Sequence, residues 1–137
     1  MRRPSVHKKL KLKSTVGFAD IMLSERRLEQ AIVTAGATFD VIVASKMPVN
    51  PDDILCLPTF ETIISELKSS YDYIIIDTPS LDAYTDGLII AKKADGMILV
   101  IKDKKTLYKA YDETVKKLED HGVTLLGTIL NSTKEKL

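Results

Sequence analysis

Cysteine is almost absent from this 137-residue sequence, and tryptophan is absent altogether. Because Cys56 is the single cysteine, no disulfide can form within the chain, as is usual in a reducing compartment. No apolar run approaches the ~18 residues that a membrane-spanning helix needs. The basic start lacks the apolar stretch of a secretory signal. We therefore expect a cytoplasmic protein whose contact with a membrane is peripheral, at the inner face.

An excess of charge is also missing. The 20 Lys and Arg residues nearly balance 19 Asp and Glu residues, and the net charge of +1 does not favour nucleic acid as a partner. Basic residues nevertheless crowd residues 1–15, namely Arg2, Arg3, Lys8, Lys9, Lys11 and Lys13. This segment is either a solvated, flexible N-terminus or a contact for phosphate or anionic lipid. The length predicts a single domain over residues 1–137.

Short apolar, β-branched runs alternate with helical patterns along the chain. The runs predict four buried strands: Phe39–Ala44, Tyr73–Asp77, Met97–Lys102 and Thr124–Asn131. Helices are predicted over Val16–Leu23, Leu28–Val33, Asp52–Ser69 with a break at Pro58, Thr85–Lys93 and Leu107–His121. This alternation predicts βαβ units and a parallel sheet covered on both faces. Ligands of such sheets bind beyond the carboxyl ends of the strands.

Polar residues at the ends of two of these predicted strands are candidates for ligand contacts. Asp77 ends the apolar run Tyr73–Ile76 and precedes Thr78 and Pro79. A carboxylate held on rigid backbone at this position can bind a phosphate-bound Mg²⁺, as in a Walker B motif. An Asp that only caps the next turn would give the same sequence pattern. Asn131 ends the last predicted strand and is either a contact for a base edge or an ordinary turn residue.

Several segments, taken in order, resemble the bacterial tyrosine kinases of capsular and exopolysaccharide biosynthesis. The segments are Met1–His7, which resembles the end of the Walker A′ motif, Gly17–Ile21, Met47–Pro51 with Ile54-Leu55, Tyr71–Pro79 as Walker B, and Thr85-Asp86. The resemblance covers essentially the whole chain. It implies a three-layer, parallel-sheet α/β fold like that of the P-loop NTPases and partition ATPases, incomplete at its N-terminus.

The resemblance also implies a site and partners. Asp77 would organise Mg²⁺, Asp86 would lie near the nucleotide, Arg2 would be the Walker A′ arginine, and Asn131, with Thr78 and Pro79, would line the ATP site. Family members use ATP and Mg²⁺ to phosphorylate their own tyrosines. They work with a membrane-spanning polysaccharide co-polymerase that activates them, and kinase protomers can associate with one another.

Two family features are missing from these 137 residues. A P-loop has the form G-x-x-x-x-G-K-[ST], and none of the six glycines is followed by lysine. The two Walker A′ aspartates would fall before Met1. We therefore expect this polypeptide alone to bind no ATP and to be inactive. Two alternatives stay open: a non-catalytic interaction module that docks on a membrane activator, and a remnant of a partition- or septum-type ATPase.

Overall fold

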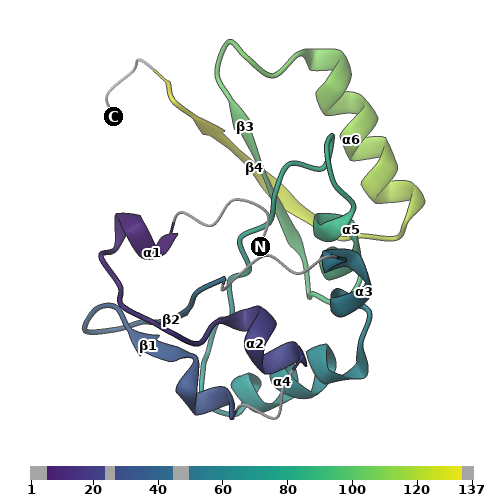
Figure 1. The fold of residues 1–137 in the computed structure, drawn as a ribbon. Helices are drawn as coiled ribbons and strands as arrows, with labels where there is room; N and C mark the ends of the chain where they lie inside the picture. The colour runs from purple at the N-terminus through teal and green to yellow at the C-terminus, as the bar shows by residue number, and fades with distance from the viewer. Residues whose placement is uncertain (1–5, 24–26, 45–49, 134–137) are drawn as a thin grey trace. The chain divides into compact units, whose positions relative to one another are not determined.

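The computed structural model describes residues 6–23, 27–44 and 50–133. Its contacts divide the chain into two compact units, residues 1–78 and residues 79–137, and each is described here by itself. Figure 1 traces the elements of both units from the N-terminus to the C-terminus. The sequence-based expectation of a single domain stays a prediction. No helix among the described residues has the length and apolar character needed to cross a bilayer.

The first unit is built from short helices and one strand hairpin. Its elements are α1 (Val6–Lys9), α2 (Phe18–Leu23), the 3-10 helix η1 (Leu28–Gln30), β1 (Ile32–Thr34), β2 (Asp40–Ile42), α3 (Pro51–Leu55) and α4 (Pro58–Lys68). The predicted break at Pro58 is confirmed, because this residue begins α4 after a short interruption. Proline suits the first turn of a helix, where its missing N–H would have no intrahelical partner.

The hairpin corrects two sequence-based predictions. Residues 28–33 do not form one helix, because η1 ends at Gln30 and β1 begins at Ile32. The β-branched run Ile32–Thr34 fits a strand better than a helix. β1 pairs antiparallel with β2, with Ile32 opposite Ile42, so the predicted strand Phe39–Ala44 shortens and does not join a parallel sheet.

The apolar core of the first unit gathers on its helices. Its buried residues are Ala19, Ile21, Met22, Leu28, Ala31, Val43, Ile54, Leu55, Phe60, Ile63 and Leu67. The rings of Phe18 and Phe60 meet edge to face with centroids 6.0 Å apart. This geometry places the positive ring edge against the negative face of its neighbour. α4 is therefore tied to α2 through aromatic packing as well as burial.

The segment from Tyr73 to Asp77 is not a strand, which corrects the sequence-based prediction for the Walker B run. No secondary structure is assigned between Tyr73 and Ser80, and Tyr73, Ile75 and Ile76 are exposed. A strand needs a neighbour to take its backbone hydrogen bonds. The described part of the chain supplies no strand paired with this segment.

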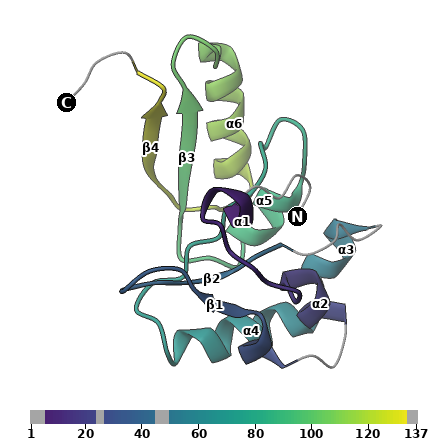
Figure 2. The same ribbon diagram turned by 60° about the vertical axis from the view of Figure 1, so that its left-hand side comes forward.

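The second unit contains α5 (Asp86–Ala91), β3 (Met97–Lys102), α6 (Tyr108–Asp120) and β4 (Leu125–Asn131). β3 and β4 pair in parallel, which confirms the predicted parallel arrangement for these strands. Figure 2 shows the two arrows pointing the same way with α6 beside them. The register shifts between Met97 and Ile98, because Met97 lies opposite Leu125 while Ile98 lies opposite Gly127. The extra residue, Leu126, is thus a local bulge.

One apolar cluster holds this second unit together. It consists of Leu81, Leu88, Ala91, Leu118 and Val123, with Met97, Leu99 and Leu125 packed against it. α6 and one face of the β3–β4 pair meet in this cluster. Ile98 and Val100, which alternate with these packed residues along β3, are exposed.

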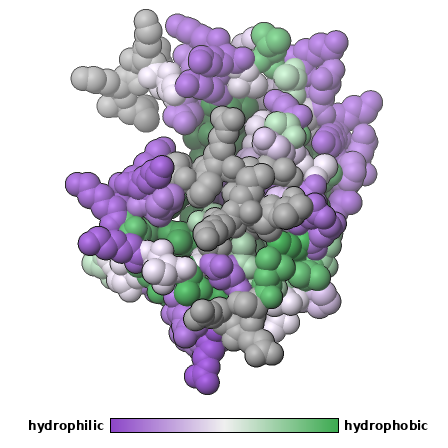
Figure 3. Space-filling model, in the orientation of Figure 1, coloured by the Kyte–Doolittle hydropathy of each residue, from purple (hydrophilic) through white to green (hydrophobic). Residues whose placement is uncertain are grey.

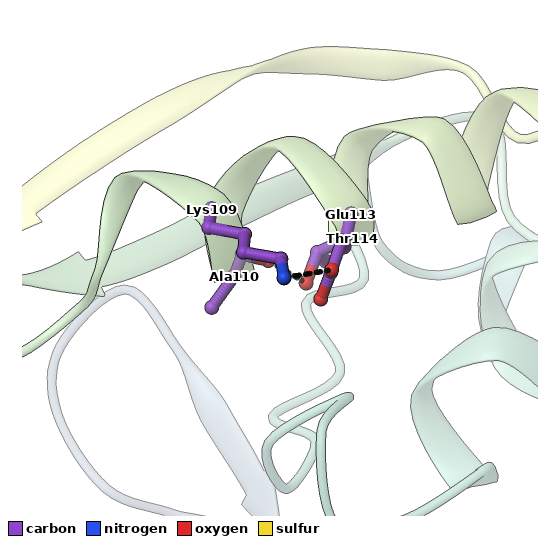
Figure 4. Close-up of polar contacts among 4 residues, drawn as sticks. All are labelled: Lys109, Ala110, Glu113 and Thr114. Atoms are coloured by element: carbon purple, nitrogen blue, oxygen red, sulfur yellow. Dashed lines mark hydrogen bonds and ion pairs between the residues drawn. The ribbon is translucent and has the colours of Figure 1, made fainter.

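α6 ends in a glycine C-cap, and polar contacts lie on its exposed face. Gly122 has a φ of +67°, which confirms the left-handed C-cap predicted after the helix. Lys109 and Glu113 form an i,i+4 ion pair at 3.9 Å, and the Thr114 hydroxyl donates to the Ala110 carbonyl at 2.7 Å (Figure 4). Both charged side chains are well exposed, so the pair adds little stability. Hydrophilic side chains dominate the visible surface over α6 (Figure 3).

Candidate nucleotide site

The residues that the sequence predicts for the site fall on both units. Asp77 and Thr78 end the first unit, whereas Pro79, Asp86 and Asn131 belong to the second. Asp77 follows the extended apolar segment and its carboxylate is exposed. Arg2, the predicted Walker A′ arginine, lies outside the described residues. Within the described ranges, no group of three or more His, Cys, Asp or Glu side chains is placed to hold a metal ion.

This arrangement limits what Asp77 can do by itself. Mg²⁺ in phosphate sites keeps several water ligands and is bound by one or two carboxylates together with the phosphates of the substrate. The single exposed carboxylate of Asp77 can therefore serve as the protein's Mg²⁺ ligand only when the phosphates of the substrate are held beside it. The backbone N–H groups and lysine of a P-loop would hold them, and that pattern does not occur in the 137 residues.

Asp86 differs from Asp77 in its burial. It is the first residue of α5, and among the described residues it is the only buried charged side chain, at 2% exposure. A carboxylate in the first turn of a helix interacts favourably with the partial positive charge there. Leu88 and Ala91 of the same helix lie in the apolar cluster of the second unit. Asp86 is therefore anchored on a packed element, while its predicted role near the nucleotide stays a prediction.

Asn131 uses its side chain locally. It is the last residue of β4, and its Oδ1 accepts a hydrogen bond from the Ser132 backbone N–H at 2.7 Å. Ser132 has a φ of +64°, and the Asn131 carbonyl accepts from the Asp103 N–H at 2.9 Å. These contacts are those of a turn residue that ends a strand.

Sequence reasoning missed a polar pair in the first unit. The Tyr71 hydroxyl donates a hydrogen bond of 2.6 Å to the Asp40 carboxylate, which joins the chain after α4 to β2. This bond, helped by one from Thr34 and opposed by desolvation, holds the pKa of Asp40 below its usual value. The same bond raises the pKa of Tyr71, with desolvation and the charge of Asp40 acting in the same direction. The partners lie 31 positions apart, so no local pattern reveals them.

Replacing Tyr71 by phenylalanine should lower the melting temperature in a pH-dependent way. A lowered carboxyl pKa in the folded state stabilises the protein above the ordinary pKa, and that stabilisation is lost as the pH falls through the lowered value. The raised pKa of Tyr71 acts at the other end, where stability is lost as the pH rises through it. Thermal unfolding of wild type and Tyr71→Phe should therefore differ most near neutral pH and converge in acid. Tyr108→Phe, on exposed α6, is the control; an equal loss at every pH would contradict this explanation.

Known proteins match the chain over nearly its whole length. Tyrosine-protein kinase YwqD of Bacillus subtilis (strain 168) is 32% identical over 135 residues, which are 98% of this chain and 57% of that protein. Tyrosine-protein kinase ptk of Acinetobacter johnsonii is 31% identical over 132 residues, which are 96% of this chain and 18% of that protein. The crystal structure of the VpsO kinase domain superposes with a TM-score of 0.90 and 27% identity, covering 97% of this chain and 66% of that one.

No family model matches the chain. The chain spans little more than half of the Bacillus subtilis relative and a smaller share of the Acinetobacter one. Sequence similarity and structural superposition nevertheless agree on one group of proteins, and they confirm the resemblance on which the site prediction rests. The sequence relatives of this chain are bacterial tyrosine-protein kinases, and its fold is that of part of their P-loop NTPase-like kinase domain.

Proposed function

We propose that this chain is part of an ATP-dependent protein-tyrosine kinase that phosphorylates its own tyrosines and regulates the synthesis and export of capsular or exopolysaccharide. The observation that carries the proposal is the match over 98% of the chain to a protein named as a tyrosine kinase. The Tyr71–Pro79 run, which has the Walker B form, supports it. The kinase would act at the inner face of the membrane with a membrane-spanning activator, and with other kinase protomers.

In the complete site, each predicted residue has a defined task. Asp77 would contribute the carboxylate of the Mg²⁺ shell, with Thr78 and Pro79 shaping the turn beside it. Asp86 would lie near the nucleotide, Asn131 near the adenine, and Arg2 in the Walker A′ segment. ATP and Mg²⁺ supply the phosphoryl group and neutralise its developing charge. The protein's share of the work is positioning, and positioning fails where a phosphate-holding element is absent.

The 137-residue polypeptide alone should therefore bind no Mg-ATP at micromolar nucleotide. The phosphates of ATP would meet neither the glycine loop nor the lysine that binds them in a P-loop. Isothermal titration calorimetry tests this directly, with Asp77→Asn as the matched variant. Both polypeptides should give only heats of dilution. Micromolar binding to the wild-type chain that Asp77→Asn removes would contradict the expectation.

A chimera tests whether kinase activity appears once a P-loop is supplied to this chain. The segment of the Bacillus subtilis relative that the match does not cover would be fused to this chain, as the source of the P-loop that the resemblance implies for the family. Phosphotyrosine that appears with Mg-ATP and is lost in the Asp77→Asn chimera supports a kinase. A folded chimera that binds ATP without forming phosphotyrosine would instead support the non-catalytic docking module, which the exposed apolar residues Tyr73 and Ile75 also favour.

A further inference from the structure

Residues 6–13, which we call the basic turn, carry a local excess of positive charge. Its lysines are all exposed: Lys8, Lys9, Lys11 and Lys13. No ion pair joins any of them to a carboxylate among the described residues. The first acidic residue of the sequence is Asp20, and its carboxylate accepts a hydrogen bond from the Gly17 N–H at 2.8 Å. The charge of the basic turn is therefore not neutralised by its neighbours along the chain.

Backbone hydrogen bonds give the basic turn a defined shape. α1 ends in a Schellman motif, in which the Leu12 N–H donates to the His7 carbonyl at 2.8 Å and the Lys11 N–H donates to the Lys8 carbonyl at 3.3 Å. Lys11 has a φ of +54°, the left-handed conformation that this motif requires after the helix. The lysines of α1 and those that follow it thus belong to one folded turn rather than to an extended strand.

The rest of the chain has the opposite sign of charge. Residues 1–15 hold six basic and no acidic residues, a net charge of +6. The remaining 14 Lys and Arg residues face all 19 Asp and Glu residues, so residues 16–137 carry a net charge of −5. A negatively charged surface attracts one segment of such a chain and repels the remainder. This asymmetry would orient the chain on that surface, although its net charge is close to zero.

We propose that the basic turn docks the chain onto an anionic lipid surface, with its lysine ammonium groups against the phosphates of the headgroups. Lysine clusters are attracted by the negative potential of such a surface, and their long stems can lie along the apolar boundary. Val6 and Leu10 of the same turn are 36% and 43% exposed, and aliphatic side chains of this kind enter the boundary between headgroups and acyl chains. The inference rests on the membrane location in the proposed function but needs neither nucleotide nor kinase chemistry.

The composition of the basic turn favours lipid over nucleic acid. Proteins that bind single strands combine basic side chains with aromatic rings on which the bases stack. Residues 6–15 contain no Phe, Tyr or Trp, and they contain no arginine, whose planar fork binds individual phosphates in a bidentate way. Lysine is a compact point charge on a long stem. Such a set of charges suits a diffuse field of headgroups rather than a defined phosphate position.

Vesicle co-sedimentation of the 137-residue chain, without ATP, measures the docking. The chain should bind vesicles made of equal parts phosphatidylglycerol and phosphatidylcholine, and it should not bind vesicles of phosphatidylcholine alone. Added salt should weaken the binding, because it screens charges at a surface. The triple variant Lys8→Gln, Lys9→Gln and Lys13→Gln should lower the partition coefficient about tenfold or more. Arginine at the same three positions keeps the charge and should restore binding.

The matched control removes three charges elsewhere. Lys92→Gln, Lys105→Gln and Lys116→Gln change exposed lysines of the second unit, and this variant should bind within about twofold of wild type. Circular dichroism should show the same fold for all variants. The proposal is overturned by a wild type that does not bind the anionic vesicles, by equal binding to both kinds of vesicle, or by equal losses in the two glutamine variants.

Two further outcomes are kept apart by the same assay. Wild-type binding to single-stranded DNA, lost in the basic-turn variant and not matched by binding to anionic vesicles, would assign the turn to nucleic acid and overturn the proposal. Because no ATP is present, failure to bind vesicles leaves the chimera's test of kinase activity unaffected. A chimera without phosphotyrosine would in turn leave the vesicle result standing.

Discussion

Replacing Leu118 by alanine should lower the free energy of unfolding by about 2–5 kcal/mol, the range for large-to-small changes of a buried leucine. Leu118 lies on α6, is only 1% exposed and belongs to the cluster that joins this helix to β3 and β4. Truncation removes methyl groups that contact several neighbours and leaves a cavity. The second unit has few other large buried side chains with which to fill it.

The matched control for this truncation is Leu107→Ala. Leu107 lies immediately before α6, is 73% exposed and should lose about 0.5 kcal/mol or less, as surface substitutions do. Denaturant unfolding followed by circular dichroism gives both values. Hydrogen exchange of the β3 and β4 amides should accelerate in Leu118→Ala and stay unchanged in Leu107→Ala. Equal losses in the two variants would show that the cluster does not support the second unit.

Elements with strong local signals were predictable from the sequence. α6 was predicted to within a residue at each end because its apolar spacing and the following Gly122 both mark it. β3 has the predicted bounds, and β4 differs by one residue. Pro58 marks the start of α4 correctly because its ring is compatible only with the first turn of a helix. In each instance the signal lies within the element itself.

The failures arise where structure depends on a distant partner. Tyr73–Asp77 has strand composition, yet composition cannot supply the neighbouring strand that makes a strand. The same reason explains why β2 pairs with β1 in a hairpin, since the order of pairing is not encoded in either run alone. Residues 28–33 divide between η1 and β1 because the β-branched end overrides the helical spacing.

For the candidate site, the sequence predicted which elements carry the residues, but it did not predict what surrounds their side chains. The predictions placed Asp86 at a helix start and Asn131 at a strand end, and the structure agrees on both placements. The burial of Asp86 and the local hydrogen bond of Asn131 depend on packing and turn geometry that no motif specifies. Catalytic and cofactor roles for these residues, and for Asp77, remain predictions that the chimera tests.

Replacing Phe60 by alanine should have the largest effect in the first unit, lowering the free energy of unfolding by about 3–5 kcal/mol. Phe60 is 2% exposed on α4, and its ring meets that of Phe18 edge to face. Both the burial and the aromatic contact are lost together, and the contact itself contributes about 0.5–1.5 kcal/mol. Denaturant unfolding of wild type, Phe18→Ala, Phe60→Ala and the double variant separates the two terms.

Phe39→Ala is the control that isolates burial from residue type. Phe39 lies just before β2 and is 49% exposed, so the same chemical change should remove much less stability there. Its ring lies over Gly36, so a small loss is expected rather than none. The coupling between Phe18 and Phe60 should appear as a double variant that loses less than the sum of the single variants. Strict additivity would mean that the two rings are neighbours without stabilising each other, and α4 would then be held by burial alone.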